Sequence, residues 1–231
     1  MGSIRAIIFD LDDTLWDCHP VIGRAEHALY EFLRTRYPRV TQRYDLDAMR
    51  ALRVQVAREH PAMRHDFTWL RLESLRRHAH EAGYPPTMAE EAFEVFYRAR
   101  NEVVLYEDVR PALDRLAGRY RLFAISNGNA NLRAIGLDHY FEAALAARDA
   151  GMLKPDPRIF DILLQRAGLQ PAQAAHVGDD QEADIEGARA AGVLPVWLNR
   201  AGVAWDRESP APDVVIASLD ALPEALHRGG R

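Results

Sequence analysis

The stretch FDLDDTLWD, residues 9–17, decides the fold. It continues the apolar run IRAIIF, residues 4–9, which is short, rich in β-branched residues and typical of a buried strand. Several carboxylates follow this run at once: Asp10, Asp12, Asp13 and Asp17. Like charges a few ångströms apart repel each other, and burial strengthens the repulsion. Either some of these side chains turn to solvent, or a cation neutralises them.

The composition is that of an ordinary folded protein. Of 231 residues, 48% are hydrophobic and 27% charged, which is enough for a sizeable core. The formal net charge of −5 argues against a nucleic-acid-binding surface, which needs a dense basic face. No apolar run approaches the ~18 residues of a membrane span, no secretory signal is evident, and the one cysteine, Cys18, fits a reducing compartment. We expect a cytoplasmic protein without nucleic-acid or membrane partners, and the oligomeric state stays open.

The basic residues are 28 arginines and a single lysine, Lys154. Codon bias in a GC-rich genome can explain the excess of arginine, but it does not explain why one lysine persists. Arginine carries a planar fork, whereas lysine carries a compact point charge on a thin stem. A site with room only for an ammonium group would retain a lysine.

Residues 18–100 are predicted to form a helical insertion. Four segments show apolar residues at helical spacing or helix start and stop signals: 21–37, 45–60, 67–83 and 87–103. Thr87 and Glu90 have the spacing of a capping box at the start of the last segment. No strand pattern separates the four.

From about residue 108, strand and helix patterns alternate. Strands are predicted over 121–126, 143–148, 174–180, 193–199 and 213–218. One helix between them is predicted to start with Asp156 as its N-cap and to stop at Gly168, and another covers 182–192. This alternation predicts an α/β fold with a doubly wound parallel sheet, formed by residues 1–17 and 101–231.

Polar residues gather where the predicted strands end, and ligands bind at that edge of an open parallel sheet. They are Asp10, Asp12, Ser126, Asn127, Lys154, Asp179, Asp180 and Asp184. Carboxylates suit Mg²⁺, while a hydroxyl, backbone N–H groups and an ammonium suit a phosphate. Asp10, Asp12 and Asp179 could share a metal ion that offsets their repulsion.

Each cluster alone has a simpler interpretation. An Asp after a strand is often a turn residue or a helix cap, which is the interpretation we prefer for Asp13 and Asp17. Ser126-Asn127-Gly128 alone is an ordinary turn signal. The nine histidines and Cys18 show no spacing typical of metal ligands.

Together, four segments resemble the motifs of the haloacid dehalogenase (HAD) superfamily. They are FDLDDTL (9–15), FAISNGN (123–129), LKPDPRIF (153–160) and HVGDDQEADIEGA (176–188). They stand in the family's order and at its spacings, and they tie together most of residues 4–200. The resemblance implies a HAD-like, Rossmann-like core, and it identifies residues 18–100 as a C1-type helical cap.

The resemblance also implies an enzyme, a Mg²⁺-dependent hydrolase of small phosphate monoesters. Asp10 would be the nucleophile that forms an aspartyl-phosphate, and Asp12 the general acid and base. Ser126, Asn127 and Lys154 would hold the phosphoryl group. Asp184 would orient Lys154 or a metal-bound water. The Mg²⁺ ligands would be Asp10, Asp12 and Asp179.

The substrate depends on finer similarities. Residues 124–142, the fourth motif and RHDFTWLR (64–71) resemble the branch that dephosphorylates flavin mononucleotide and the phosphorylated ribitylamino-pyrimidine precursor of riboflavin. Phe67 and Trp69 could stack on such a heterocycle or pack in the cap's own core, and both options stay open.

Other functions stay open too. Sugar phosphates or phosphoglycolate could be the substrates, and a phosphomutase shares all four motifs. A dehalogenase of the superfamily needs the nucleophile but not the second aspartate, so Asp12 favours phosphoryl transfer. A non-catalytic protein that binds a phosphorylated ligand is the alternative of a different class.

Overall fold

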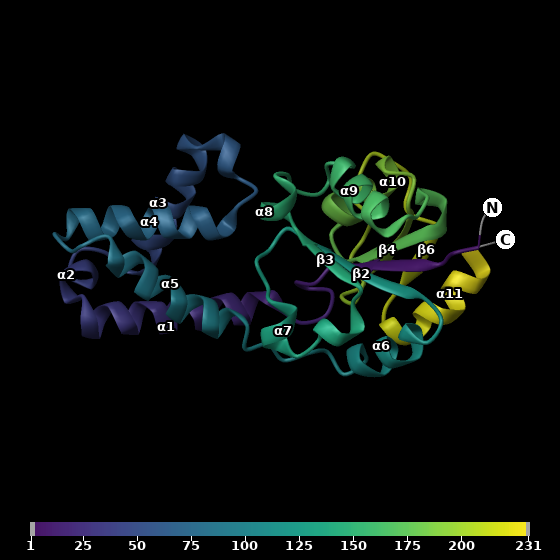
Figure 1. Cartoon of the computed structure of the whole chain (residues 1–231), viewed down its shortest axis with the longest axis horizontal. Helices are drawn as coiled ribbons and strands as arrows, with labels where there is room; N and C mark the ends of the chain where they lie inside the picture. Colours follow the sequence, from purple (N-terminus) through teal and green to yellow (C-terminus); the bar gives the residue numbers. More distant parts are fainter. Residues whose placement is uncertain (1–2, 230–231) are drawn as a thin grey trace. The chain divides into compact units, whose positions relative to one another are not determined.

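The computed structural model describes residues 3–229, shown in Figure 1. The chain separates into two compact units, which we call the core unit (residues 1–17 and 104–231) and the helical unit (residues 18–103). The boundary expected at residue 100 therefore lies at residue 103 in the structure. Within the described residues, no helix is long and apolar enough to cross a membrane.

The core unit is built on a parallel sheet. Over the described residues it has six strands in the order β3-β2-β1-β4-β5-β6. The strands are β1 (Ala6–Phe9), β2 (Arg121–Ser126), β3 (Ala143–Ala146), β4 (Ala174–Gly178), β5 (Leu194–Leu198) and β6 (Val214–Ile216). β1 lies in the middle and is buried on both faces, which explains its uninterrupted apolar sequence. The predicted doubly wound α/β fold is confirmed.

Helices cover both faces of the sheet. Figure 1 shows α9 and α10 over one face and α6 and α11 over the other. Alternate strand residues, among them Ile8, Phe123 and Ile125, pack with Phe160 and Leu163 of α9 in one apolar cluster. The helices of this unit are α6 (Val109–Ala117), α7 (Leu132–Ile135), α8 (Ala147–Ala150), α9 (Arg158–Ala167), α10 (Gly187–Ala190) and α11 (Leu222–Gly229).

The helical unit has an apolar core of its own. Leu29 and Leu33 of α1 pack there with Leu75, Met88 and Phe96 from later helices. The four predicted helices are present, and a short helix, α2, follows the first of them. Their bounds are α1 (Cys18–Arg36), α2 (Pro38–Thr41), α3 (Leu46–Glu59), α4 (Phe67–Glu81) and α5 (Thr87–Arg100).

Two predicted helix caps are wrong, and proline is the reason in both cases. Pro86 occupies the N-cap position of α5 with a helical φ of −55°, so Thr87 is already inside the helix and makes no capping box. Pro157 is likewise the N-cap of α9, and Asp156 lies one residue before it. The Asp156 carboxylate still accepts a hydrogen bond from the backbone N–H of Arg158 at 3.0 Å.

The helix predicted over residues 182–192 is also interrupted. Residues Gln181–Glu186 form a wide π-helical turn, and α10 begins only at Gly187. Asp180 caps this turn, because its carboxylate accepts hydrogen bonds from the backbone N–H groups of Glu182 and Ala183. Such turns are frequent at functional sites, where they redirect a side chain.

His78 of α4 is an exception to the apolar core of the helical unit. It is 1% exposed, its ring lies 4.5 Å from that of Tyr44, and neither ring nitrogen has a hydrogen-bond partner. Burial lowers the pKa of His78 to about 4, because a charged ring in this place would lose its water. In the unfolded chain this histidine has an ordinary pKa near 6.5. Between pH 6.5 and pH 4 the unfolded chain therefore binds more protons than the folded protein.

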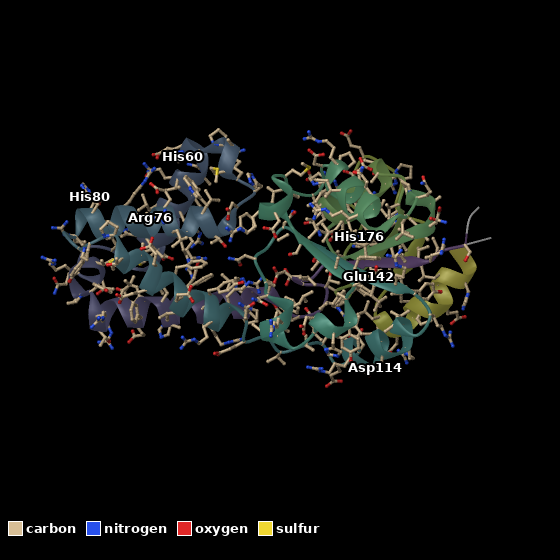
Figure 2. All side chains as sticks on the ribbon, in the orientation of Figure 1. His60, Arg76, His80, Asp114, Glu142 and His176 are labelled. Carbon is tan, nitrogen blue, oxygen red and sulfur yellow. The ribbon has the colours of Figure 1, made fainter. Side chains whose placement is uncertain are left out.

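We predict that the protein loses stability as the pH falls through this window. The linkage relation gives a loss of about 2 kcal/mol from His78 between pH 7 and pH 5. His78→Leu should be more stable than wild type and should lose correspondingly less over the same range, measured by urea unfolding. His80→Leu is the matched control, because His80 is exposed and points away from the helical unit (Figure 2). Equal pH dependence in wild type and His78→Leu would contradict the prediction.

Candidate active site

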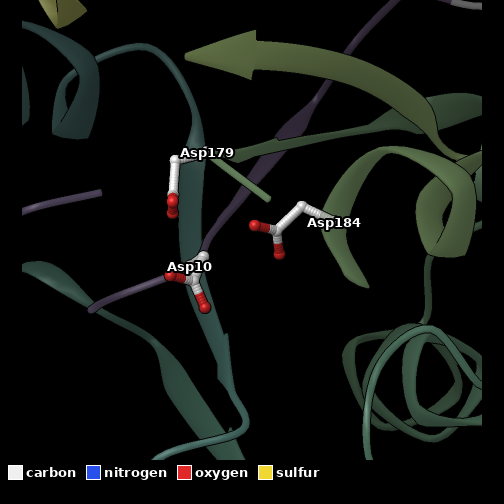
Figure 3. Close-up of side chains that lie close together, drawn as sticks. All are labelled: Asp10, Asp179 and Asp184. Carbon is white, nitrogen blue, oxygen red and sulfur yellow. The ribbon is translucent and has the colours of Figure 1, made fainter. Parts of the chain in front are cut away.

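Polar residues from three neighbouring strands meet at the carboxyl edge of the sheet. Asp10 follows β1, Ser126 ends β2, and Asp179 follows β4. β1 lies between β2 and β4 in the sheet, so these residues come together although they are far apart in sequence. Figure 3 shows Asp10, Asp179 and Asp184 side by side.

Lys154 is the centre of this group. Its Nζ donates to Asp10 Oδ1 at 2.5 Å, to Asp184 Oδ1 at 2.6 Å and to the carbonyl of Ile125 at 3.1 Å. These three bonds use all three donors of the ammonium. Burial by itself lowers the pKa of Lys154, but the Asp10 and Asp184 carboxylates outweigh it and raise the pKa above its ordinary value. The lysine is therefore a permanent buried cation.

Asn127 fixes the loop that carries Lys154. Its side-chain oxygen accepts from the backbone N–H of Lys154 at 2.8 Å, and its side-chain nitrogen donates to the Lys154 carbonyl at 3.0 Å. Ser126 Oγ accepts from the backbone N–H of Gly128 at 2.9 Å. Both polar atoms of the Asn127 side chain are thus engaged with the Lys154 backbone, and a role for Asn127 in phosphate binding stays a prediction.

Asp184 is held from three sides. Besides Lys154, it accepts from His176 Nε2 at 2.9 Å and from the backbone N–H of Asp180 at 3.0 Å. Burial raises the pKa of this carboxyl, but the Lys154 ammonium and the His176 hydrogen bond outweigh burial and hold it well below its ordinary value. Asp184 has the contacts required to orient Lys154.

Three carboxylates lie close together at this edge, and Lys154 binds two of them. Oxygens of Asp10, Asp179 and Asp184 all lie within 4.8 Å of one another. Burial, with the charges of Asp184 and Asp13, raises the pKa of Asp179 to about 7. Burial also raises the pKa of Asp10, although Lys154 opposes it. The excess of negative charge and the oxygen atoms of these carboxylates fit a divalent cation. Asp184 already binds both Lys154 and His176, so Asp10 and Asp179 are the better candidates for metal ligands.

Asp12 is not a member of this carboxylate cluster. One of its oxygens, Oδ1, accepts a hydrogen bond from the indole N–H of Trp16 at 2.9 Å. Thr14, from the same loop, donates to Asp179 Oδ1 at 3.1 Å. A role for Asp12 as a metal ligand stays a prediction.

The aromatic residues of the helical unit stay undecided as well. Phe67 is 44% exposed, and Trp69 is half-buried with its ring 5.1 Å from that of His60. Neither is part of the apolar core of the helical unit as described above. Part of each side chain therefore remains accessible to a ligand.

Sequence reasoning missed His176, Trp16 and the strict need for Gly178. His176 is the first residue of the fourth motif, and this position was a usable signal. At Gly178, an added Cβ would lie only 2.2 Å from Asp184 Cγ. The glycine is therefore required by the carboxylate that packs against it, not by a turn.

We predict that Gly178→Ala displaces Asp184 and destabilises the core unit. The backbone atoms of β4 cannot move easily, so the buried carboxylate must give way. Overpacking of this kind costs about 1–3 kcal/mol, which urea unfolding would detect. Gly118→Ala is the control, because no atom lies within 4 Å of a Cβ there. Equal stability of the two variants would show that the strand adapts.

Comparison with known proteins agrees with this geometry. The model of the haloacid dehalogenase-like hydrolase family matches residues 4–192. A 5-amino-6-(5-phospho-D-ribitylamino)uracil phosphatase of Escherichia coli K12 is 32% identical over 202 residues, which is 86% of this chain and 84% of that protein. A phosphoserine phosphatase of Thermus thermophilus is 36% identical over 63% of this chain and 61% of its own.

A solved structure has a closely similar fold. The 2-haloacid dehalogenase of Pseudomonas syringae pv. Tomato DC3000 is 40% identical, with a TM-score of 0.93 over 98% of this chain and 99% of that one. The chain belongs to the haloacid dehalogenase-like hydrolase family.

Proposed function

We propose that this hydrolase is a cytoplasmic, Mg²⁺-dependent phosphatase of small phosphate monoesters that works through an aspartyl-phosphate. The observation that carries the proposal is the buried Lys154 ammonium between Asp10 and Asp184, beside a third carboxylate, Asp179. A phosphate monoester brings negative charge to this place, so the site needs positive charge from both lysine and a metal ion.

The residues divide the chemistry among them. Asp10, oriented by Lys154, attacks phosphorus, and the ammonium neutralises charge on the phosphoryl oxygens. Ser126 and the backbone N–H groups after it hold those oxygens. Asp12 gives a proton to the leaving alcohol and later takes one from water. Asp10 and Asp179, with Asp12 as a further predicted ligand, would hold Mg²⁺, which supplies charge stabilisation to the phosphoryl group.

A dehalogenase is the alternative that the similar Pseudomonas syringae structure raises. Displacement of a halide releases an anion that needs no proton, so that reaction does not need a second carboxylate as a general acid. The presence of Asp12 therefore favours phosphoryl transfer.

The substrate we favour is flavin mononucleotide or the phosphorylated ribitylamino-pyrimidine precursor of riboflavin. The Escherichia coli relative, which is named for that precursor, matches across 86% of this chain, whereas the phosphoserine phosphatase matches across 63%. We propose that the helical unit acts as the cap that selects the leaving group. The exposed Phe67 and the half-buried Trp69 offer it aromatic surface for a planar heterocycle.

We predict that phosphate release from such esters requires Mg²⁺. EDTA should abolish turnover and added Mg²⁺ should restore it, measured as inorganic phosphate across flavin mononucleotide, the precursor, phosphoserine, phosphoglycolate and sugar phosphates. Asp10→Asn should be inactive on all of them, because the amide cannot attack phosphorus.

The same panel, extended by 2-chloropropionate, separates the alternatives. Chloride release from 2-chloropropionate without phosphatase activity would make the protein a dehalogenase. Phosphatase activity that is highest on phosphoglycolate would contradict the flavin proposal but leave the reaction class in place. Ligand binding without turnover would identify a non-catalytic protein.

We predict that Lys154→Arg is not a conservative change. The planar guanidinium cannot make the three short contacts that Nζ makes in a fully buried pocket. Loss of a donor to developing charge lowers kcat by about 100-fold or more. Arg158→Lys, on the exposed start of α9, is the matched control and should keep wild-type kcat. A folded Lys154→Arg protein with normal kcat/KM would place the lysine outside the chemistry.

A further inference from the structure

Trp16 makes a hydrogen bond that the proposed mechanism does not yet use. Its side chain is completely buried, and its indole Nε1 donates to Asp12 Oδ1 at 2.9 Å. An indole N–H can donate but never accept a hydrogen bond. The oxygen that faces Trp16 is therefore always an acceptor, in the carboxylate and in the carboxylic acid alike.

The loop around Trp16 holds this contact in place. Asp13 adopts a left-handed backbone with φ of 62°, which turns the chain so that Asp12 and Trp16 become neighbours. The backbone N–H of Asp13 donates to the Trp16 carbonyl at 2.8 Å. On the other side, the N–H of Tyr106 donates to the Leu15 carbonyl at 3.0 Å, beside the bridge between Trp16 and Leu105. The backbone around Trp16 is thus held by bonds that do not involve the Asp12 side chain.

We propose that Trp16 is the positioning residue for the general acid and base. The inference rests on the proposed phosphatase function. By binding Oδ1, Trp16 fixes the orientation of the Asp12 carboxyl. When the Asp10 oxygen bonds to phosphorus and the bond to the leaving oxygen breaks, the proton of the Asp12 carboxyl passes to that oxygen. When water then attacks phosphorus and the bond to Asp10 breaks, the Asp12 carboxylate takes the proton of the water.

This role has a signature that a purely structural role lacks. A general acid matters most when the leaving group is a poor one, such as an alkoxide, and least when it is a stabilised phenoxide. Proton transfer of this kind contributes typically about 10²–10⁴-fold to the rate. A misplaced Asp12 should therefore slow alkyl phosphates far more than p-nitrophenyl phosphate, whereas general damage to the site slows both alike.

The test is kcat/KM of Trp16→Phe on the best alkyl phosphate of the panel and on p-nitrophenyl phosphate, because kcat/KM reports formation of the aspartyl-phosphate, whereas hydrolysis of that intermediate is the same step for both esters. We expect kcat/KM to fall by about 10-fold or more on the alkyl ester and by less than about threefold on the aryl ester. Trp205→Phe is the matched control, because its indole donates to the Ser209 carbonyl at 2.7 Å in the same unit and does not contact Asp12. It should keep wild-type kcat/KM on both esters.

A double-mutant cycle with Asp12→Asn completes the experiment. If Trp16 acts through Asp12, Trp16→Phe has no further effect on the alkyl ester once Asp12 is Asn. Benzothienylalanine at position 16, which replaces the N–H by sulfur at nearly the same shape, removes the bond without a cavity and should reproduce the effect if Trp16→Phe does not fold. Equal losses on both esters, or additive losses in the cycle, would overturn the proposal. A wild-type protein that hydrolyses neither ester would instead overturn the proposed function.

Discussion

The contact on which the core unit depends is the ion pair of Lys154 with Asp10 and Asp184. Burying an ion costs several kcal/mol even in real proteins, and only short, well-directed bonds to an opposite charge offset that cost. Here the ammonium has three acceptors within 3.1 Å, and each comes from a different part of the chain. Asn127 fixes the lysine backbone, the π-helical turn delivers Asp184, and Gly178 leaves room for its carboxylate. A change in any of these supports leaves a buried charge without its partner.

The same ion pair leaves the site with more negative than positive charge. Asp179 has no ammonium of its own, and its pKa rises to about 7 because burial and neighbouring carboxylates disfavour its charged form. A divalent cation would offset this surplus of negative charge. The chain is similar both to phosphatases and to a dehalogenase, so proteins of this fold catalyse two different reactions. Side chains at the active site, rather than the fold, decide which reaction takes place.

The helical unit buries apolar side chains in its core, and His78 is an exception because its buried ring nitrogens have no hydrogen-bond partner. Its apolar stripes were readable at helical spacing, so the four long helices could be predicted from the sequence. The cap of α5 could not, because Pro86 occupies the N-cap position in place of the expected Thr87. The uncompensated nitrogens of His78 were not predictable either, since an absent hydrogen-bond partner is a property of all the elements that surround a residue.

The sequence by itself determined the α/β sheet and the gathering of Asp10, Lys154 and Asp179 at its carboxyl edge. Strand and helix periods are local, and the rule that parallel strands end at one edge needs no coordinates. Only the tertiary structure decided which groups touch: Asn127 with Lys154, His176 with Asp184, and the fully buried Trp16 with Asp12. The first two pairs join different loops, and the third depends on the left-handed turn at Asp13. Hydrogen bonds act over about 3 Å, so they depend on backbone placement that sequence periodicity does not encode.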